Sequence, residues 1–226
     1  KHFPGHGDTD TDSHFALPLI RHSVARIDTV ELYPFRQLIA AGIPGVMVAH
    51  LNVPSYDSAN IPASLSHHIV TQLLREKMHF DGLCFTDAMN MKGVTKGNSP
   101  GEADVKALSA GNDILLFPEN VEATVKKVKA AIRKGILTEE DIDEKCRRVL
   151  AAKEKYVLPN AGMIDTTMLS ARLNTPADQA LLQETYAEAI TLIQNKDLLL
   201  PLTHLDTLRI ASLNFGDRKA KAFEDM

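Results

Sequence analysis

Three short apolar runs are the clearest pattern in the first half of the chain, at 45–50, 82–87 and 112–117. Each run is apolar almost throughout and does not alternate between apolar and polar residues. Such runs are typical of parallel strands whose two faces are both covered by other elements. The pattern therefore predicts three buried strands of one parallel sheet.

The segments around these runs have the spacing of amphipathic helices. The apolar positions at 32–39 predict a helix that ends near Gly42, and those at 69–74 predict a second helix that Ser64 or Ser66 can cap. Glycines and acidic first turns mark the ends of three further helices, which we expect at 102–110, at 119–134 and from Thr138 onward.

The strand-like runs recur every roughly 30–36 residues, which predicts repeated β-α units. A strand begun by His2 and Phe3 brings the number to about four, whereas a closed TIM-type barrel needs eight. Polar side chains such as His50 and Asp87 follow the strands, where barrel enzymes carry their chemistry. We therefore expect α/β architecture, with residues 1–156 forming the C-terminal half of a TIM-type (β/α)8 barrel.

The pattern changes after residue 156. Residues 157–202 are expected to form a linker and a helix at about 177–193, and 203–226 the beginning of a truncated C-terminal α/β domain with a strand at 208–213. The sequence opens within a motif at Lys1 and stops soon after that strand. We expect both ends to be cut, so that any export signal lies upstream.

Composition narrows the function classes. Hydrophobic residues make up 44% and charged residues 24%, as in folded globular domains, and the net charge of −4 gives no field that recruits nucleic acid. The sequence contains no run of about 18 apolar residues, so it predicts no membrane-spanning helix. Cys84 and Cys146 are too few for a disulfide framework and are expected to be free thiols.

Residues 1–14 are unusually rich in side chains that can act in catalysis or bind a metal. They include three histidines and three aspartates, together with two glycines and a proline. Asp12 and His14 are separated by one residue, so a loop can fold their side chains together. A carboxylate beside an imidazole fixes its tautomer and stabilises its protonated form, which makes an acid/base group. A polar surface loop is the simpler interpretation, and a metal site formed by His2, His6 and His14 with Asp8 or Asp12 is the other.

Asp87 is the second candidate, because it ends an apolar strand and would reach the mouth of a barrel. The alternative is that its carboxylate caps the turn or helix that follows. Met89 and Met91, next along the chain, are predicted to be packing residues.

These motifs resemble, in order, those of glycoside hydrolase family 3, in particular its bacterial β-N-acetylglucosaminidases that trim peptidoglycan. Residues 1–7 with 12–14 are similar to the family's signature loop, and the later matching blocks lie at 49–50, 62–66, 80–82, 86–91 and 110–113. The resemblance extends to about residue 156. Residues 189–195 and 200–202 are similar to the entry into the family's second domain, an α/β sandwich.

The resemblance implies a role for each matching residue. Asp87 would be the nucleophile, His14 the general acid and later the base, and Asp12 the partner of His14 in a retaining double displacement. The side chains implied to bind the sugar in the first subsite are Lys1, His2 and, more loosely, His50. The ligand would be a glycan containing N-acetylglucosamine, such as a peptidoglycan fragment or a chitin oligosaccharide, and no cofactor is implied.

The family's earlier barrel strands have no counterpart before Lys1. The missing barrel half is expected from another chain, a swapped copy or the full-length protein, and the chain alone is expected to have little turnover. Two other functions stay open, a metal-dependent hydrolase using His2, His6 and His14, and a catalytically inert barrel fragment. The sequence does not decide between the bacterial cytoplasm and the periplasm or cell surface.

Overall fold

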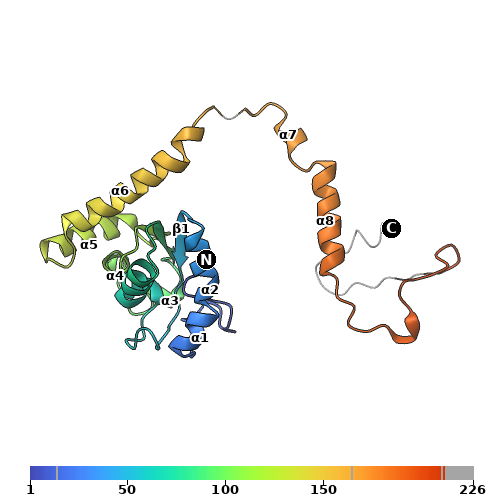
Figure 1. Cartoon of the computed structure of the whole chain (residues 1–226), viewed down its shortest axis with the longest axis horizontal. Coiled ribbons are helices and arrows are strands. Elements are labelled where there is room, and N and C mark those ends of the chain that lie inside the picture. The colour runs from blue at the N-terminus through green and yellow to red at the C-terminus, as the bar shows by residue number, and fades with distance from the viewer. Residues whose placement is uncertain (14, 164, 210, 212–226) are drawn as a thin grey trace. The chain divides into compact units, whose positions relative to one another are not determined.

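The computed structural model describes residues 1–13, 15–163, 165–209 and 211. The chain divides into two units, Lys1–Gly162 and Met163–Met226, which are described separately. The first unit is α/β, as expected, and its centre is a three-stranded parallel sheet in the order β1-β2-β3 (Figure 1). The strands are β1 (Gly45–Val48), β2 (Leu83–Ala88) and β3 (Ile114–Leu116), at the three positions predicted from the apolar runs.

The start of the chain lies beside β1. Phe3 forms an isolated parallel bridge with Val48, in which the Phe3 amide donates to the Met47 carbonyl at 2.8 Å and the Ala49 amide donates to the Phe3 carbonyl at 2.9 Å. The strand expected at His2 and Phe3 is thus a single bridge. The spatial order Phe3, β1, β2, β3 follows the chain order, and it brings residues 1–13 to the carboxyl ends of the strands.

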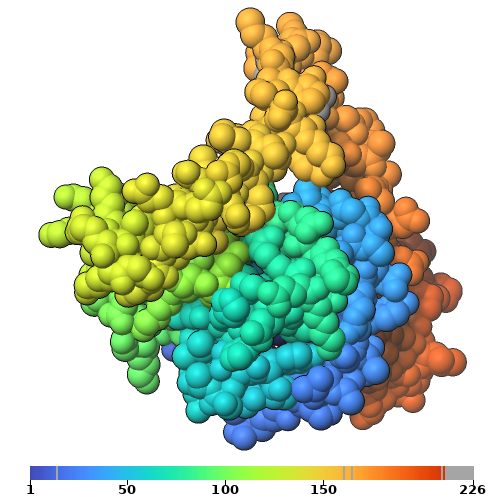
Figure 2. Space-filling model, turned by 60° about the vertical axis from the view of Figure 1, so that its left-hand side comes forward, coloured from blue at the N-terminus to red at the C-terminus, as the bar shows by residue number. Residues whose placement is uncertain are grey.

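Helices separate the strands as the periodicity predicts. Before β1 lie α1 (Val24–Thr29) and α2 (Leu32–Ala40), and between β1 and β2 lie a 3-10 turn, η1 (Ala63–Leu65), and a π-helix, η2 (His68–Lys77). The remaining elements of the unit are α3 (Lys92–Thr95), α4 (Glu102–Ala110), α5 (Val121–Arg133), α6 (Glu139–Tyr156) and a 3-10 turn, η3 (Leu158–Asn160). Figure 2 shows α6, in yellow, lying on the green and teal surface of the first unit.

The predicted helix ends are confirmed where side chains cap them. Ser66 Oγ accepts a hydrogen bond from the Ile69 amide at 3.2 Å at the start of η2. Thr138 and Asp141 form a reciprocal capping box at the start of α6, so the acidic first turn also satisfies free backbone donors. These caps stabilise the helix starts by about 1 kcal/mol each.

Buried apolar side chains join the helices to one face of the sheet. Residues alternate between buried and half-buried along β1 and β2, and β3 is half-buried throughout, so the prediction that both faces of the strands are covered is wrong. Phe3 is fully buried and its ring packs edge-on against Phe35 of α2, with centroids 5.1 Å apart. A second cluster around Met89 holds α3 and α4 beside the carboxyl end of β2. Met89 and Met91 are 2% and 6% exposed, which confirms the prediction that they are packing residues.

The second unit contains α7 (Leu169–Arg172), α8 (Pro176–Ala189) and a 3-10 turn, η4 (Lys196–Leu198). The helix predicted at 177–193 corresponds to α8, which Thr175 and Asp178 begin with a second capping box. The strand predicted at 208–213 includes residues 210, 212 and 213, which lie outside the described residues. The division into 157–202 and 203–226 therefore stays a prediction.

The composition predicted two free thiols and no membrane-spanning helix. Cys84 is buried and Cys146 exposed, and both are free, as predicted. Within the described part of the chain, every helix is too short or too polar to cross a lipid bilayer.

Candidate active site

An open cleft of about 750 Å³ lies at the carboxyl end of β2, and loop 1–13 forms its other wall. Its lining consists of Lys1, His2, His6, Gly7, Asp12, Ser13 and Asp87. Four of the six side chains proposed from sequence therefore share one cavity, namely Lys1, His2, Asp12 and Asp87. Residues more than seventy positions apart meet here because parallel strands end at the same edge of the sheet.

Asp87 presents one carboxylate oxygen to the protein and the other to the cleft. Oδ1 accepts a hydrogen bond from the Ala88 amide at 2.8 Å, and Oδ2 lies 3.9 Å from His2 Nε2. The side chain is 14% exposed, so it is mostly shielded yet reachable. It does not cap α3, whose N-cap residue is Met91. A carboxylate held in this way is suited to act as a nucleophile or as an anionic stabiliser.

His2 is a neutral group at ordinary pH. Burial lowers the pKa of its imidazole, the Asp87 carboxylate opposes that shift, and the neighbouring Lys1 and His6 side chains add to it. The His2 ring meets that of His6 edge-on, with centroids 5.9 Å apart. A neutral ring at the cleft wall offers one donor and one acceptor, which suits the hydroxyls of a sugar.

Of the acid/base pair predicted from the sequence, Asp12 lies within the described residues. Asp12 lines the cleft, and its backbone carbonyl accepts from the amides of Phe15 at 3.1 Å and Ala16 at 3.2 Å, which fixes the turn of the loop there. His14 lies outside the described residues. The pairing of Asp12 with His14 therefore stays a prediction.

His50 lies beneath the cleft and not in its lining, unlike the expectation from sequence. It is fully buried, with Nδ1 2.7 Å from Ser64 Oγ and Nε2 3.0 Å from the Ala88 carbonyl. Both ring nitrogens are thus occupied by the protein itself. The physical reason is that the ring is enclosed between Ser64 of η1 and the end of β2.

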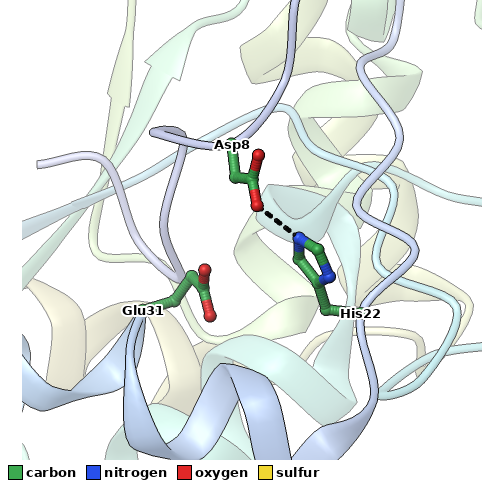
Figure 3. Close-up of side chains that lie close together, drawn as sticks. All are labelled: Asp8, His22 and Glu31. Carbon is green, nitrogen blue, oxygen red and sulfur yellow. Dashed lines mark hydrogen bonds and ion pairs between the residues drawn. The ribbon is translucent and has the colours of Figure 1, made fainter.

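A polar cluster anchors loop 1–13 to the helices below it (Figure 3). His22 Nε2 lies 2.6 Å from Asp8 Oδ2, and the Arg26 guanidinium lies 2.6 Å from Glu31 Oε1 and 3.6 Å from Asp8 Oδ2. Gly5 sits directly over Glu31 with a φ of +138°, and a Cβ there would lie 2.7 Å from Glu31 Cβ. The loop is therefore tied to α1 and α2 by charge and by close backbone packing.

The same cluster bears on the metal hypothesis. Among the described residues, Asp8, His22 and Glu31 form the one group of three side chains whose possible ligand atoms all lie within 4.8 Å of one another. The predicted set of His2, His6 and His14 includes residue 14, which lies outside those residues, and so stays a prediction. The Arg26 guanidinium already brings a positive charge to both carboxylates. We interpret the cluster as an ion-pair anchor. His22, Arg26 and Glu31 were not predicted from the sequence. They hold loop 1–13 in place by ion pairs, and no sequence motif marks such a role.

The chain is similar to known proteins over most of its length. Residues 1–152 match the family described as glycosyl hydrolase family 3 N terminal domain. The chain belongs to glycosyl hydrolase family 3. The resemblance inferred from the motifs is confirmed, and the amino-terminal domain of this family is a TIM-type barrel.

Three relatives illustrate the similarity. Beta-hexosaminidase A of Pseudoalteromonas piscicida is 31% identical over 97% of this chain, which covers 39% of that protein. A family 3 beta-N-acetylglucosaminidase structure from Paenibacillus sp. is 40% identical with a TM-score of 0.69, over 73% of this chain and 32% of that one. The structure of beta-glucoside phosphorylase BglX is 30% identical with a TM-score of 0.82, over 89% and 38%. The chain thus spans about two-fifths or less of their length.

Proposed function

We propose that this family 3 chain supplies the reacting groups for hydrolysis of terminal β-N-acetylglucosaminides with retention of configuration. The observation that carries the proposal is the single cleft that Asp87 shares with Asp12, Lys1 and His2. The names of the similar proteins, beta-hexosaminidase and beta-N-acetylglucosaminidase, support the sugar class. Peptidoglycan fragments and chitin-type oligosaccharides both fit it.

In the first step Asp87 acts as the nucleophile. Its Oδ2 attacks the anomeric carbon while protonated His14 donates its proton to the leaving oxygen, so the glycosidic bond breaks as an ester to Asp87 forms. The hydrogen bond from the Ala88 amide to Oδ1 leaves Oδ2 as the oxygen on the cleft side. Lys1 and His2 would donate hydrogen bonds to the sugar hydroxyls and hold the ring against Asp87.

In the second step the same groups act in reverse. Neutral His14 takes a proton from water, the water oxygen attacks the anomeric carbon, and the ester to Asp87 breaks. Two inversions at one carbon restore the original configuration. Asp12 would stabilise the imidazolium that forms in this step and hold the ring in one orientation.

The remaining barrel strands would have to come from elsewhere. In the part of the chain that the structure describes, β3 pairs with β2 on one side, and Phe3 makes a single bridge to β1. Both outer edges of this sheet are open, whereas a barrel closes them. We infer that another part of a longer protein, another chain or a swapped copy completes the barrel, and that the chain alone has little turnover.

A chimera tests this function. Residues 1–162 would replace the matching segment of the Paenibacillus enzyme, which supplies the other barrel strands. We expect hydrolysis of an aryl N-acetylglucosaminide, a first product of β configuration by NMR, and a fluorosugar adduct on Asp87 by peptide mass spectrometry. A folded chimera that binds the sugar but gives the α product, or that carries its adduct at another residue, would refute the proposal.

Phosphate is a second candidate acceptor in place of water. A neutral imidazole base repels an incoming anion less than a carboxylate base would. The similarity to a protein named beta-glucoside phosphorylase favours the same idea. If phosphate is the acceptor, the chimera will release N-acetylglucosamine 1-phosphate at a rate that rises with phosphate concentration. Release of free sugar alone, at a rate independent of phosphate, would exclude it.

A further inference from the structure

His50 is a fully buried histidine that the proposed chemistry does not use. Its ring lies between two elements, with Ser64 of η1 on the Nδ1 side and the end of β2 on the Nε2 side. The charge of Asp87 interacts with it electrostatically. A histidine in such a place needs an explanation, because an apolar side chain would be buried at lower cost.

The contacts of the ring fix its tautomer. The Ala88 carbonyl can only accept, so Nε2 carries the hydrogen and donates it at 3.0 Å. In the neutral ring Nδ1 is then an acceptor, and the Ser64 hydroxyl donates to it at 2.7 Å. Burial lowers the pKa of the His50 imidazole, although the Ala88 carbonyl and the Asp87 charge oppose that shift. The ring is therefore held neutral in its Nε2–H form.

Ala88 links this histidine to the nucleophile. Its amide donates to Asp87 Oδ1 at 2.8 Å, and its carbonyl accepts from both His50 Nε2 and the Met91 amide, the latter at 3.1 Å. The next amide, that of Met89, donates to the Leu116 carbonyl at 2.7 Å. The backbone that aims the Asp87 carboxylate is thus held from three directions, and the contact from His50 is the one made by a side chain.

Ser64 is fixed in its turn, so it can hold the ring. It is fully buried, its amide donates to the Ala49 carbonyl at 3.1 Å, and its carbonyl accepts from Asn112 Nδ2 at 2.8 Å. Asn112 is also fully buried and stands just before β3. A continuous buried path therefore runs from Asn112 through Ser64 and His50 to Ala88, and it spans the three strands of the sheet.

We propose that His50 is a positioning residue, which in its Nε2–H tautomer holds the Ala88 carbonyl and thereby orients Asp87 Oδ2 toward the cleft. The inference rests on the proposed function, in which Asp87 is the nucleophile. His50 itself touches no substrate. Its loss is expected to slow attack on the anomeric carbon while leaving sugar binding nearly unchanged, because displacement of a reacting atom by about 1 Å can cost about 100-fold in rate.

The tautomer can be tested in this chain without any enzyme activity. Nitrogen-15 NMR of the histidine rings should give His50 the shifts of a neutral Nε2–H ring from pH 7.5 down to pH 5.5. His67, exposed at the start of η2, serves as the solvent-accessible reference ring. An Nδ1–H ring at His50, or a His50 ring that becomes protonated within this range, would overturn the proposal whether or not the chain belongs to an enzyme.

The effect on catalysis can be tested in the chimera described above. His50→Leu removes the donor and is expected to lower kcat by about 100-fold with KM changed by less than about threefold. His50→Gln, whose amide can donate to the same carbonyl, should recover most of that loss. His67→Leu is the matched control and should behave as the parent does. Thermal melting of each variant verifies that it is folded, and the Gln variant decides the matter should His50→Leu fail to fold.

The possible outcomes distinguish failure of the positioning role of His50 from failure of the proposed function, in which Asp87 is the nucleophile. An adduct on Asp87 that forms at the parent rate in His50→Leu, or a His50→Gln variant as slow as His50→Leu, would refute the positioning role and leave the nucleophile standing. An adduct at another residue would refute the nucleophile first. A rise in KM equal to the fall in kcat/KM would show that His50 serves sugar binding, which also contradicts the proposal.

Discussion

Two aspartates lie at opposite ends of β2, and their surroundings differ. Asp87 belongs to β2 itself, whereas Asp113 stands just before β3 and contacts the amino end of β2 through the Cys84 amide. At the amino end, Asp113 has a fully buried side chain that meets Arg75 at 2.6 Å, Arg148 at 2.8 Å and the Cys84 amide at 2.8 Å. At the carboxyl end, the Asp87 carboxylate has one short hydrogen bond, from the amide of its neighbour, and His2 at 3.9 Å. Both oxygens of the Asp113 carboxylate are thus bound by protein groups, whereas Oδ2 of Asp87 faces the cleft.

This difference separates stability from chemistry between the two ends of the sheet. A saturated buried ion pair resists change, because the loss of one partner leaves uncompensated charges. A carboxylate with an oxygen toward a cavity can form a new bond. Barrel enzymes divide their two faces in this manner, with stability at the amino ends of the strands and catalysis at the carboxyl ends.

The same substitution at both ends gives the largest expected contrast. In the chimera, Asp87→Asn should lower activity by about 1,000-fold or more, while its free energy of unfolding stays within about 0.5 kcal/mol of the parent. Asp113→Asn should lower that free energy by about 3 kcal/mol, because Arg75 and Arg148 lose their counter-charge. Urea unfolding and steady-state kinetics measure the pair. Equal destabilisation by both changes would contradict the division of roles.

A smaller effect is expected from the loop that faces Asp87. Gly5→Ala adds a Cβ at a φ of +138° and 2.7 Å from Glu31 Cβ, so the loop must shift off its anchor. We expect about 1–3 kcal/mol of lost stability. Gly7→Ala is the matched control, since nothing lies within 4 Å of a Cβ there. Thermal unfolding of the two variants of this chain checks the prediction, and similar losses for both would contradict it.

The pH dependence of stability should sharpen the contrast further. The His50 pKa is lowered from 6.5 in the folded chain by burial, so below pH 6.5 the unfolded chain binds a proton that the folded chain does not. Stability contributed by the neutral ring is therefore present above pH 6.5 and declines as the pH falls below it. His50→Gln should flatten this decline between pH 7.5 and 5.5, as measured by urea midpoints. An unchanged slope would mean that His50 protonates equally in both states.

The smallest effect concerns the thiols. Burial raises the pKa of Cys84 to about 12, and its amide is held by Asp113, whereas Cys146 is exposed. A thiol reagent at pH 8 should therefore label Cys146 and spare Cys84, as peptide mass spectrometry can show. Asp113→Asn should raise labelling of Cys84 by loosening the amino end of the strand. Equal labelling of both thiols in the parent would show that this end opens readily.

Much of the scaffold could be predicted from the sequence because it follows from local patterns. Apolar runs located all three strands, and helical spacing located α2, α4, α5, α6 and α8. The rule that chemistry follows the strands pointed to Asp87 and to residues 1–14, and the family resemblance singled out Lys1, His2 and Asp12 within that stretch; all four line the cleft. Short α1 (Val24–Thr29) escaped notice, because six residues give too little periodicity to recognise.

The remainder of the site depends on contacts that no local pattern records. His50 stands two residues after β1 and Asp87 lies near the end of β2, yet His50 is covered while Asp87 opens to the cleft, and Ser64 of η1 lies against the His50 ring. The anchor formed by His22, Arg26 and Glu31 is likewise set by the path of loop 1–13 over α2. Position after a strand predicts proximity to a site, and three-dimensional packing decides access to it.

The open outer edge of β3 has a practical consequence for anyone who purifies this polypeptide. Beyond that strand, Phe117, Val121 and Val125 are 67%, 63% and 48% exposed. Exposed apolar surface therefore continues from the unpaired edge of β3 onto α5. Such a border attracts further copies or chaperones in solution. Expression together with a segment that covers this border should yield more homogeneous material than expression of the polypeptide by itself.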